Sequence, residues 1–386
     1  MSITRKKTIK KCNKKIYNLS KKSYSPNINN KLINKTVKTY QESQVKSINI
    51  CNDIFTIKIN NICYNYNDNI VQNLLLKNLK YRKKMNPEKF IAPRQKLSNC
   101  WFNTMYVSFF FSDKGIKFFR FFRELMITGK KLDNTKIDTE LHKIFFVLNL
   151  FIESSYNQNN NTSFIKYFNK YTNNLNTNYF IEKIYNIINK NENKNENKNE
   201  NKNENKNKNK LLYTIPKLND ASNPLYYYIS IINYLKYDML KILPIDIYDK
   251  YNKKQITDFI YNYLNNHKTI PEIIVLEDLD TKSNHNTEYT FTFNKQTINY
   301  KIDSIIITNK DFYEKNSNKH FTSLITCNGI GYKFDGYSYN PLTKFNWIKY
   351  LDNNIDKDWT FNENKKYISE KYNITMGYKM LFYYRV

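Results

Sequence analysis

The stretch Gln95-Lys-Leu-Ser-Asn-Cys100-Trp-Phe-Asn103-Thr104-Met-Tyr-Val-Ser-Phe-Phe110 decides the fold class. The polar residues before Cys100 predict a loop, and the apolar spacing after it predicts a buried helix, with Phe102, Met105, Tyr106, Phe109 and Phe110 on the apolar positions. Cys100 is therefore expected at a helix N-terminus, where free N–H groups and the helix dipole favour a thiolate. For this stretch alone, an inert cysteine at the start of a core helix is the alternative interpretation.

A nucleophilic thiol needs a base, and the chain has four histidines: His142, His267, His285 and His320. His142 lies in a predicted amphipathic helix. His267 and His285 have polar, loop-like surroundings. We expect structural or solvated roles for these three, which leaves His320 as the candidate base.

His320 stands between two predicted strands. The strand Tyr300–Thr308 and a polar loop precede it, and a second strand, Phe321–Cys327, follows it. A glycine-containing turn then leads back to Asp335. Two adjacent antiparallel strands would bring Asp335 beside His320, where a carboxylate can fix the imidazole tautomer and stabilise the imidazolium. The sequence thus predicts a triad of Cys100, His320 and Asp335.

Several motifs in this order resemble the ubiquitin-specific protease family of papain-like cysteine peptidases. The segment Asn99-Cys100-Trp101-Phe102-Asn103-Thr104 matches the second half of the family's cysteine box, and His320-Phe321 with Tyr332-Lys333-Phe334-Asp335 is similar to its histidine box. Gly377–Tyr383 resembles the family's closing strand. Two weaker matches, Ile270–Leu276 and Tyr300–Ile307, lie between them. The resemblance covers about residues 90–386.

The resemblance implies an α+β fold of the papain-like type, with a helical lobe followed by an antiparallel β lobe. It implies a deubiquitinating thiol protease that hydrolyses the bond after the C-terminal Gly-Gly of ubiquitin or a ubiquitin-like protein, so the expected partners are that modifier and its conjugates. Cys100 would be the nucleophile, His320 the base and Asp335 its orienting acid. The family's zinc-binding cysteine pairs are absent from the sequence, so no metal and no cofactor are expected.

The chain departs from the family pattern at three positions near the predicted site. Gln95 stands where the family often has an oxyanion-binding Asn, five residues before the cysteine. A Gln amide also presents an N–H donor, so we assign oxyanion stabilisation to Gln95 together with the Cys100 backbone N–H. The usual Gly before the histidine is Lys319, and the second acid after Asp335 is Gly336.

Composition divides the chain into three parts. Residues 1–44 form a basic arm that we expect to be disordered, because residues 1–40 hold 12 Lys or Arg and no Asp or Glu. Residues 45–89 form a small accessory segment with a predicted strand around Ile57 and a helix around Val71. Residues 90–386 form the predicted catalytic domain, and their Asn-Glu-Asn-Lys repeat at 189–210 is expected to be a flexible insertion.

Within the predicted catalytic domain, helices come first and strands second. Helices are expected at Leu141–Ile152, Asn178–Ile188 and Leu225–Leu243, and strands after about Pro271. That order is typical of an α+β domain rather than of alternating β and α units.

The overall composition excludes several classes of protein. The 386 residues carry 62 Lys+Arg against 34 Asp+Glu, a formal net charge of +28, and 40% hydrophobic residues suffice for a core. No apolar run reaches the roughly 20 residues of a membrane span. The five cysteines include no Cys-x-x-Cys pair, so a disulfide framework is not expected and an intracellular, reducing compartment, cytoplasmic or nuclear, is favoured.

Two other functions remain open on the sequence alone. A catalytically silent ubiquitin-binding module of the same fold would account for the altered residues around His320 and at position 95. A basic nucleic-acid-binding protein would account for the charge, although no recognition motif accompanies it. The basic arm is expected at most to add a weak electrostatic contact with nucleic acid or another anionic surface, unless it is simply a solvated tail.

Overall fold

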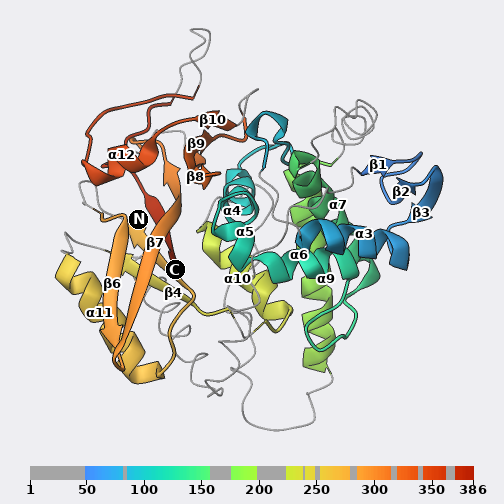
Figure 1. Ribbon diagram of the computed structural model, residues 1–386, viewed down its shortest axis with the longest axis horizontal. Helices are drawn as coiled ribbons and strands as arrows, with labels where there is room; N and C mark the ends of the chain where they lie inside the picture. The colour runs from blue at the N-terminus through green and yellow to red at the C-terminus, as the bar shows by residue number, and fades with distance from the viewer. Residues whose placement is uncertain are drawn as a thin grey trace.

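The computed structural model describes residues 48–80, 85–156, 175–197, 223–237, 240–247, 253–278, 285–313, 320–337, 342–361 and 370–386. A helical lobe and a lobe built on an eight-stranded sheet lie side by side (Figure 1). The chain therefore has the α+β composition that its element order predicted. The predicted basic arm at residues 1–44 lies outside the described residues.

The helical lobe is arranged around one buried helix, α4 (Cys100–Phe110). All residues of α4 are buried, which explains its almost continuous apolar sequence. Its neighbours are α5 (Gly115–Phe118), α6 (Arg120–Thr128), α7 (Thr139–Tyr156), α9 (Thr177–Asn197) and α10 (Pro224–Tyr234). A helix apolar on every side must be covered on every side, and α9, α10 and the sheet strand β8 (Phe321–Cys327) contact α4.

The N-terminal segment packs on the outer side of the helical lobe (Figure 1). It comprises the three-stranded sheet of β1 (Asn49–Ile50), β2 (Thr56–Ile59) and β3 (Ile62–Asn65), followed by α3 (Asn69–Lys80) and the short 3-10 helix η1 (Pro87–Lys89). Tyr66 packs against Phe146 of α7 with ring centroids 5.3 Å apart. The segment thus shares its apolar core with the helical lobe.

The second lobe is a sheet of strands of unequal length. The strand order is β10-β9-β8-β7-β11-β5-β4, and β6 pairs with β7. Its strands are β4 (Ile242–Ile247), β5 (Ile273–Asp278), β6 (Glu288–Phe293), β7 (Gln296–Thr308), β8, β9 (Ile330–Phe334), β10 (Leu342–Lys344) and β11 (Lys379–Arg385). The prediction of an antiparallel β lobe was wrong at one edge of the sheet, because β4 pairs with β5 in parallel. Parallel neighbours need a crossover connection, and α11 (Lys253–His267) lies in it.

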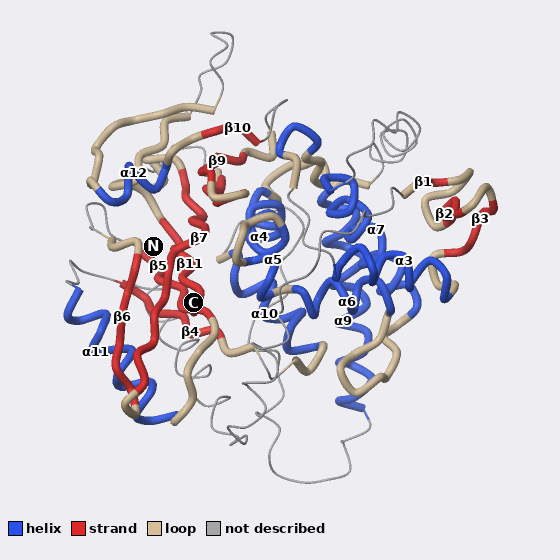
Figure 2. The backbone as a smooth tube through the Cα atoms, viewed as in Figure 1, coloured by secondary structure: helices blue, strands red, loops and turns tan. Residues whose placement is uncertain are grey.

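The sheet is buried on both faces, with a different core on each. In β11, Met380 and Phe382 face the helical lobe, whereas Leu381 and Tyr383 face the opposite side. This is the two-residue alternation of an extended strand. Helices α11 and α12 (Trp347–Asp352) cover the outer face (Figure 2). The central strands are apolar on both faces for this reason.

Two predicted boundaries were wrong. The helix expected over Leu225–Leu243 ends at Tyr234, and Lys236 adopts a left-handed backbone conformation (φ 53°) that an α-helix does not continue through. The strand β4 follows, so strands begin well before Pro271. Helix α9 continues through Asn197, into the repeat whose residues 189–210 were expected to form a flexible insertion. The rest of the repeat lies outside the described residues.

The cysteine prediction also needs a correction, since Cys51 and Cys63 form a disulfide with Cα atoms 6.1 Å apart. They are 12 positions apart in the sequence, a spacing that matches no short motif. The hairpin geometry brings them together, because β3 pairs Cys63 with Lys58 while the chain before β2 folds back through the Cys51 N–H bond to Thr56. Within the described ranges, no helix is long and apolar enough to cross a membrane.

Candidate active site

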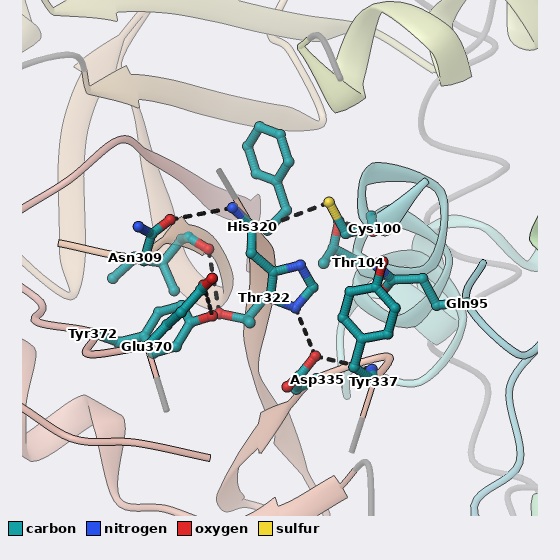
Figure 3. Close-up of polar contacts among 12 residues, drawn as sticks. Gln95, Cys100, Thr104, Asn309, His320, Thr322, Asp335, Tyr337, Glu370 and Tyr372 are labelled. Atoms are coloured by element: carbon teal, nitrogen blue, oxygen red, sulfur yellow. Dashed lines mark hydrogen bonds and ion pairs between the residues drawn. The ribbon is translucent and has the colours of Figure 1, made fainter. Parts of the chain in front are cut away.

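Cys100 begins α4, as the sequence predicted, and its side chain points toward the sheet lobe (Figure 3). The residue is 1% exposed. The Phe321 backbone N–H donates to Cys100 Sγ at 3.3 Å. The first turn of a helix has N–H groups without intrahelical partners, so the sulfur lies in surroundings that favour negative charge.

The loop before Cys100 is tied to α4 and α9. Asn103 of α4 donates from Nδ2 to the Pro93 carbonyl at 2.6 Å, which gives the Asn of the cysteine motif a structural role. The Lys96 N–H donates to Thr177 Oγ1 at 3.0 Å. The side chains of Asn99 and Asn178 also form a hydrogen bond. These contacts fix the position of the loop that carries Gln95.

His320 and Asp335 meet across the β8–β9 hairpin. The register pairs Ser323 with Phe334, so the residues just beyond the hairpin's open end become neighbours. His320 Nε2 lies 2.7 Å from Asp335 Oδ1. Because a carboxylate accepts, Nε2 donates this hydrogen bond, which leaves Nδ1 for the thiol. Asn309 Oδ1 accepts from the His320 backbone N–H at 3.2 Å and fixes the start of the strand.

Three effects act on the protonation of His320. Burial alone would lower its pKa, but hydrogen bonds with Asp335 and Cys100 and the charges of both raise the pKa to about 10. An imidazolium facing the thiol stabilises a thiolate. The arrangement places a protonated imidazole beside the Cys100 sulfur, a pairing that favours nucleophilic attack by sulfur.

Gln95, the predicted oxyanion donor, is buried and lies on the same side of the site as Cys100 (Figure 3). Its Nε2 donates a long hydrogen bond, 3.5 Å, to the Leu97 carbonyl. Its side chain packs against the backbone of Gly336, directly after Asp335. All four predicted site residues, Gln95, Cys100, His320 and Asp335, are thus brought to one place from two lobes.

The other three histidines lie elsewhere. His142 is buried in α7 with Nε2 3.2 Å from the Ile127 carbonyl, and burial lowers its pKa. His267 ends α11 and contacts the Tyr263 carbonyl through Nδ1. His285 was expected in a polar loop. It is instead buried, with Nε2 2.7 Å from Asp278.

Sequence reasoning missed Asn309 and Tyr337. The Tyr337 ring lies 5.0 Å from the His320 ring, centroid to centroid, and its N–H donates to Asp335 at 3.0 Å. Its position two residues after the predicted acid was the only available signal. Asn309 follows a strand and has no distinguishing pattern. Among the described residues, no group of three or more His, Cys, Asp or Glu side chains could hold a metal ion.

Comparison with known proteins adds little to this geometry. No family model and no curated protein matches the chain. Among solved structures, 19 chains match. One match is the SAGA Ubp8/Sgf11/Sus1/Sgf73 DUB module, with 11% sequence identity and a TM-score of 0.36, covering 100% of this chain and 96% of that chain. A TM-score of this size carries no conclusion about fold or activity.

Proposed function

We propose that the chain is a cysteine protease that hydrolyses the bond after the C-terminal Gly-Gly of ubiquitin or a ubiquitin-like protein. One observation carries the proposal. Cys100, at a helix N-terminus, lies beside His320, and His320 Nε2 lies 2.7 Å from Asp335 Oδ1. The choice of substrate rests on the sequence motifs that resemble ubiquitin-specific proteases.

In the proposed reaction, the Cys100 thiolate attacks the carbonyl carbon of the terminal glycine. The carbonyl oxygen becomes an oxyanion, which accepts hydrogen bonds from the Gln95 amide and the Cys100 backbone N–H. His320 gives its proton to the leaving lysine amine as the C–N bond breaks, leaving a thioester. His320 then takes a proton from water, the hydroxide releases the carboxylate, and the thiolate returns. Asp335 keeps the imidazole oriented throughout.

Burial of the site supports a glycine-ended substrate. Cys100 is 1% exposed and His320 7% exposed, so the sulfur has little open space around it. An extended chain without side chains at its last two residues needs the least room to reach the sulfur. A terminal Gly-Gly meets that requirement.

Covalent labelling tests this proposal directly. A ubiquitin carrying a C-terminal vinyl electrophile should form one adduct, which peptide mapping should locate at Cys100. Cys327 is the matched control, because it is also a buried free cysteine and its pKa is raised to about 12 by burial. An adduct on Cys327, or none on any cysteine, would contradict the assignment.

Turnover of a fluorogenic ubiquitin amide separates the proposed roles. Cys100→Ala should abolish turnover and leave ubiquitin binding intact, and His320→Ala should be almost as damaging. Gln95→Ala should lower kcat by about 10² to 10³, whereas Asp335→Ala should keep measurable activity because the imidazole can still accept a proton. If the wild type binds ubiquitin and cleaves nothing, a silent ubiquitin-binding module becomes the better account.

A further inference from the structure

Two residues directly after Asp335 contact the loop of the predicted oxyanion donor. Gly336 and Tyr337 directly follow the β8–β9 hairpin in the sheet lobe, whereas Gln95 and Leu97 belong to the loop before α4. Figure 3 shows Tyr337 beside Gln95. Three contacts join the two sides. Each of them places a group of the second lobe against Gln95 or against the carbonyl that Gln95 contacts.

The Leu97 carbonyl is shared by Gln95 and Tyr337. It accepts from the Tyr337 hydroxyl and, at 3.5 Å, from Gln95 Nε2. Leu97 has a left-handed backbone (φ 51°), an unusual state for a bulky side chain, so its carbonyl direction is set by the loop rather than by local preference. A hydrogen bond of 3.5 Å is at the weak limit. The Tyr337 hydroxyl also donates to this carbonyl, so the Gln95 N–H can exchange its weak hydrogen bond for one to a new acceptor.

Gly336 leaves the space that the Gln95 side chain occupies. A Cβ at position 336 would lie 2.4 Å from Gln95 Oε1 and 3.1 Å from Gln95 Cβ, closer than real contacts allow. Gln95 Oε1 accepts no hydrogen bond from the part of the chain that the structure describes, so packing rather than bonding holds that side of the amide. Gln95 is longer than an Asn would be, and the absence of a side chain at position 336 provides the space that this extra length needs.

Tyr337 touches the base as well as the donor loop. Its ring is tilted by 31° against the His320 ring at 5.0 Å, and its N–H holds Asp335. Burial raises the Tyr337 pKa, and a hydrogen bond with the Gln95 side chain acts in the opposite direction. One exposed tyrosine thus contacts the acid, the base and the oxyanion donor.

We propose that Gly336 and Tyr337 are positioning residues that hold the Gln95 amide where the oxyanion forms, in register with His320 and Asp335. This inference rests on the proposed cysteine-hydrolase function. Gly336 sets how far the Gln95 side chain extends, and the Tyr337 hydroxyl holds the loop to the opposite lobe and keeps the Gln95 N–H available.

A double-mutant cycle with the fluorogenic ubiquitin amide tests this arrangement. Tyr337→Phe and Gly336→Ala should each lower kcat about tenfold with KM changed less than about twofold, because only the transition state is affected. In a Gln95→Ala background, neither change should lower kcat further. Tyr64→Phe, a half-buried tyrosine of the small sheet, is the matched control and should keep wild-type kinetics.

The Gly336→Ala variant has its own rescue. Gln95→Asn shortens the donor side chain by one methylene and draws back the amide oxygen, which is the atom that the new Cβ would approach most closely (2.4 Å). Gln95→Asn with Gly336→Ala should therefore be more active than Gly336→Ala alone. Tyr337→Phe keeps the ring against His320, so its pH dependence should match the wild type. The proposal would be overturned if Tyr337→Phe and Gly336→Ala lowered kcat as much in the Gln95→Ala background as in the wild type, or if both single variants kept the wild-type kcat.

A second measurement does not depend on ubiquitin. A peptide aldehyde ending in Gly-Gly forms a tetrahedral adduct with Cys100 whose oxygen needs the oxyanion donor, whereas alkylation by iodoacetamide does not. Tyr337→Phe and Gly336→Ala should weaken aldehyde binding about tenfold and leave the alkylation rate unchanged. Aldehyde binding with this pattern but no ubiquitin turnover would refute the proposed substrate alone. Unchanged aldehyde affinity in both variants, or no adduct in the wild type, would overturn the positioning role.

Discussion

At the residue scale, the proposed chemistry of the site depends on one buried imidazole. His320 keeps its proton because Asp335 on one side and Cys100 on the other outweigh the effect of burial, and its pKa rises to about 10. Its ordinary value is near 6.5. The protonated form therefore persists across the neutral range and is lost only as the pH rises through about 10.

The pH dependence of turnover should change when the carboxylate is neutralised. Asp335→Asn keeps the size of the side chain but removes the charge that stabilises the imidazolium, so the pKa of His320 falls. The alkaline decline of kcat/KM, expected near pH 10 in the wild type, should move down by at least about one pH unit. Rates from pH 6 to 10.5 measure this. Asp352→Asn, on the surface of α12, is the control, and an unmoved decline in Asp335→Asn would contradict the role of Asp335.

At the element scale, the parallel pair β4–β5 brings two carboxyl groups together. Asp246 of β4 stands opposite Glu277 of β5. Glu277 also accepts from the Tyr378 hydroxyl and from Asn223 Nδ2, each at 2.8 Å. Burial and then the charge of Asp246 raise the pKa of Glu277 to about 8. This pair lies on the strand edge that sequence patterns did not predict.

The stability of the protein should depend on this pair. The folded state keeps the Glu277 proton up to about pH 8, whereas the unfolded chain releases it near 4.5, so the free energy of unfolding falls as the pH rises between these values. We expect the wild type to lose about 2 kcal/mol between pH 6 and pH 8. Glu277→Gln should remove most of that loss.

Denaturant unfolding at the two pH values measures the effect of Glu277→Gln. The exposed Glu182→Gln in α9 is the matched control and should behave as the wild type does. A Glu277→Gln protein that loses as much stability as the wild type between pH 6 and pH 8 would show that the carboxyl pair does not titrate in this range.

At the scale of the whole molecule, a buried ionic cluster joins the N-terminal segment to the helical lobe. Arg123 of α6 pairs with Glu153 of α7, and both side chains are almost fully buried. Arg123 Nε also donates to Asn149 at 3.0 Å. Asn78 of α3 donates to the other Glu153 oxygen at 3.3 Å. Three helices therefore meet at one carboxylate, on the far side of α4 from the sheet lobe.

Breaking this cluster should destabilise the protein as a whole. Arg123→Met leaves Glu153 buried without its countercharge, which costs about 3–5 kcal/mol. Adding Glu153→Leu should restore much of the loss, because an apolar pair needs no compensation. The exposed pair between Lys143 and Glu140 is the control, and Lys143→Met should change the unfolding midpoint little. A small effect of Arg123→Met would mean that the pair adds no net stability.

Local sequence patterns were sufficient to predict elements in which apolar residues recur regularly or the residues of the candidate site lie close together in the chain. The apolar run after Cys100 predicted α4, and the strand after His320 with its glycine-containing turn predicted β8 and the return of Asp335. Patterns failed where the chain leaves a helix without a proline or glycine. Lys236 turns the chain at such a point, so the helix expected to continue to Leu243 gave way to β4.

By itself, the sequence determined the mixed α+β composition, the helix that carries Cys100 and the hairpin that carries His320 and Asp335, because these depend on residues close together in the chain. Only the tertiary structure decided the parallel β4–β5 edge, the Cys51–Cys63 disulfide and the contact of Tyr337 with the Gln95 loop. Those features either join residues that are far apart in the sequence or depend on strand register. Their geometry follows from strand pairing and from the packing of the two lobes, for which a single sequence holds no local signal.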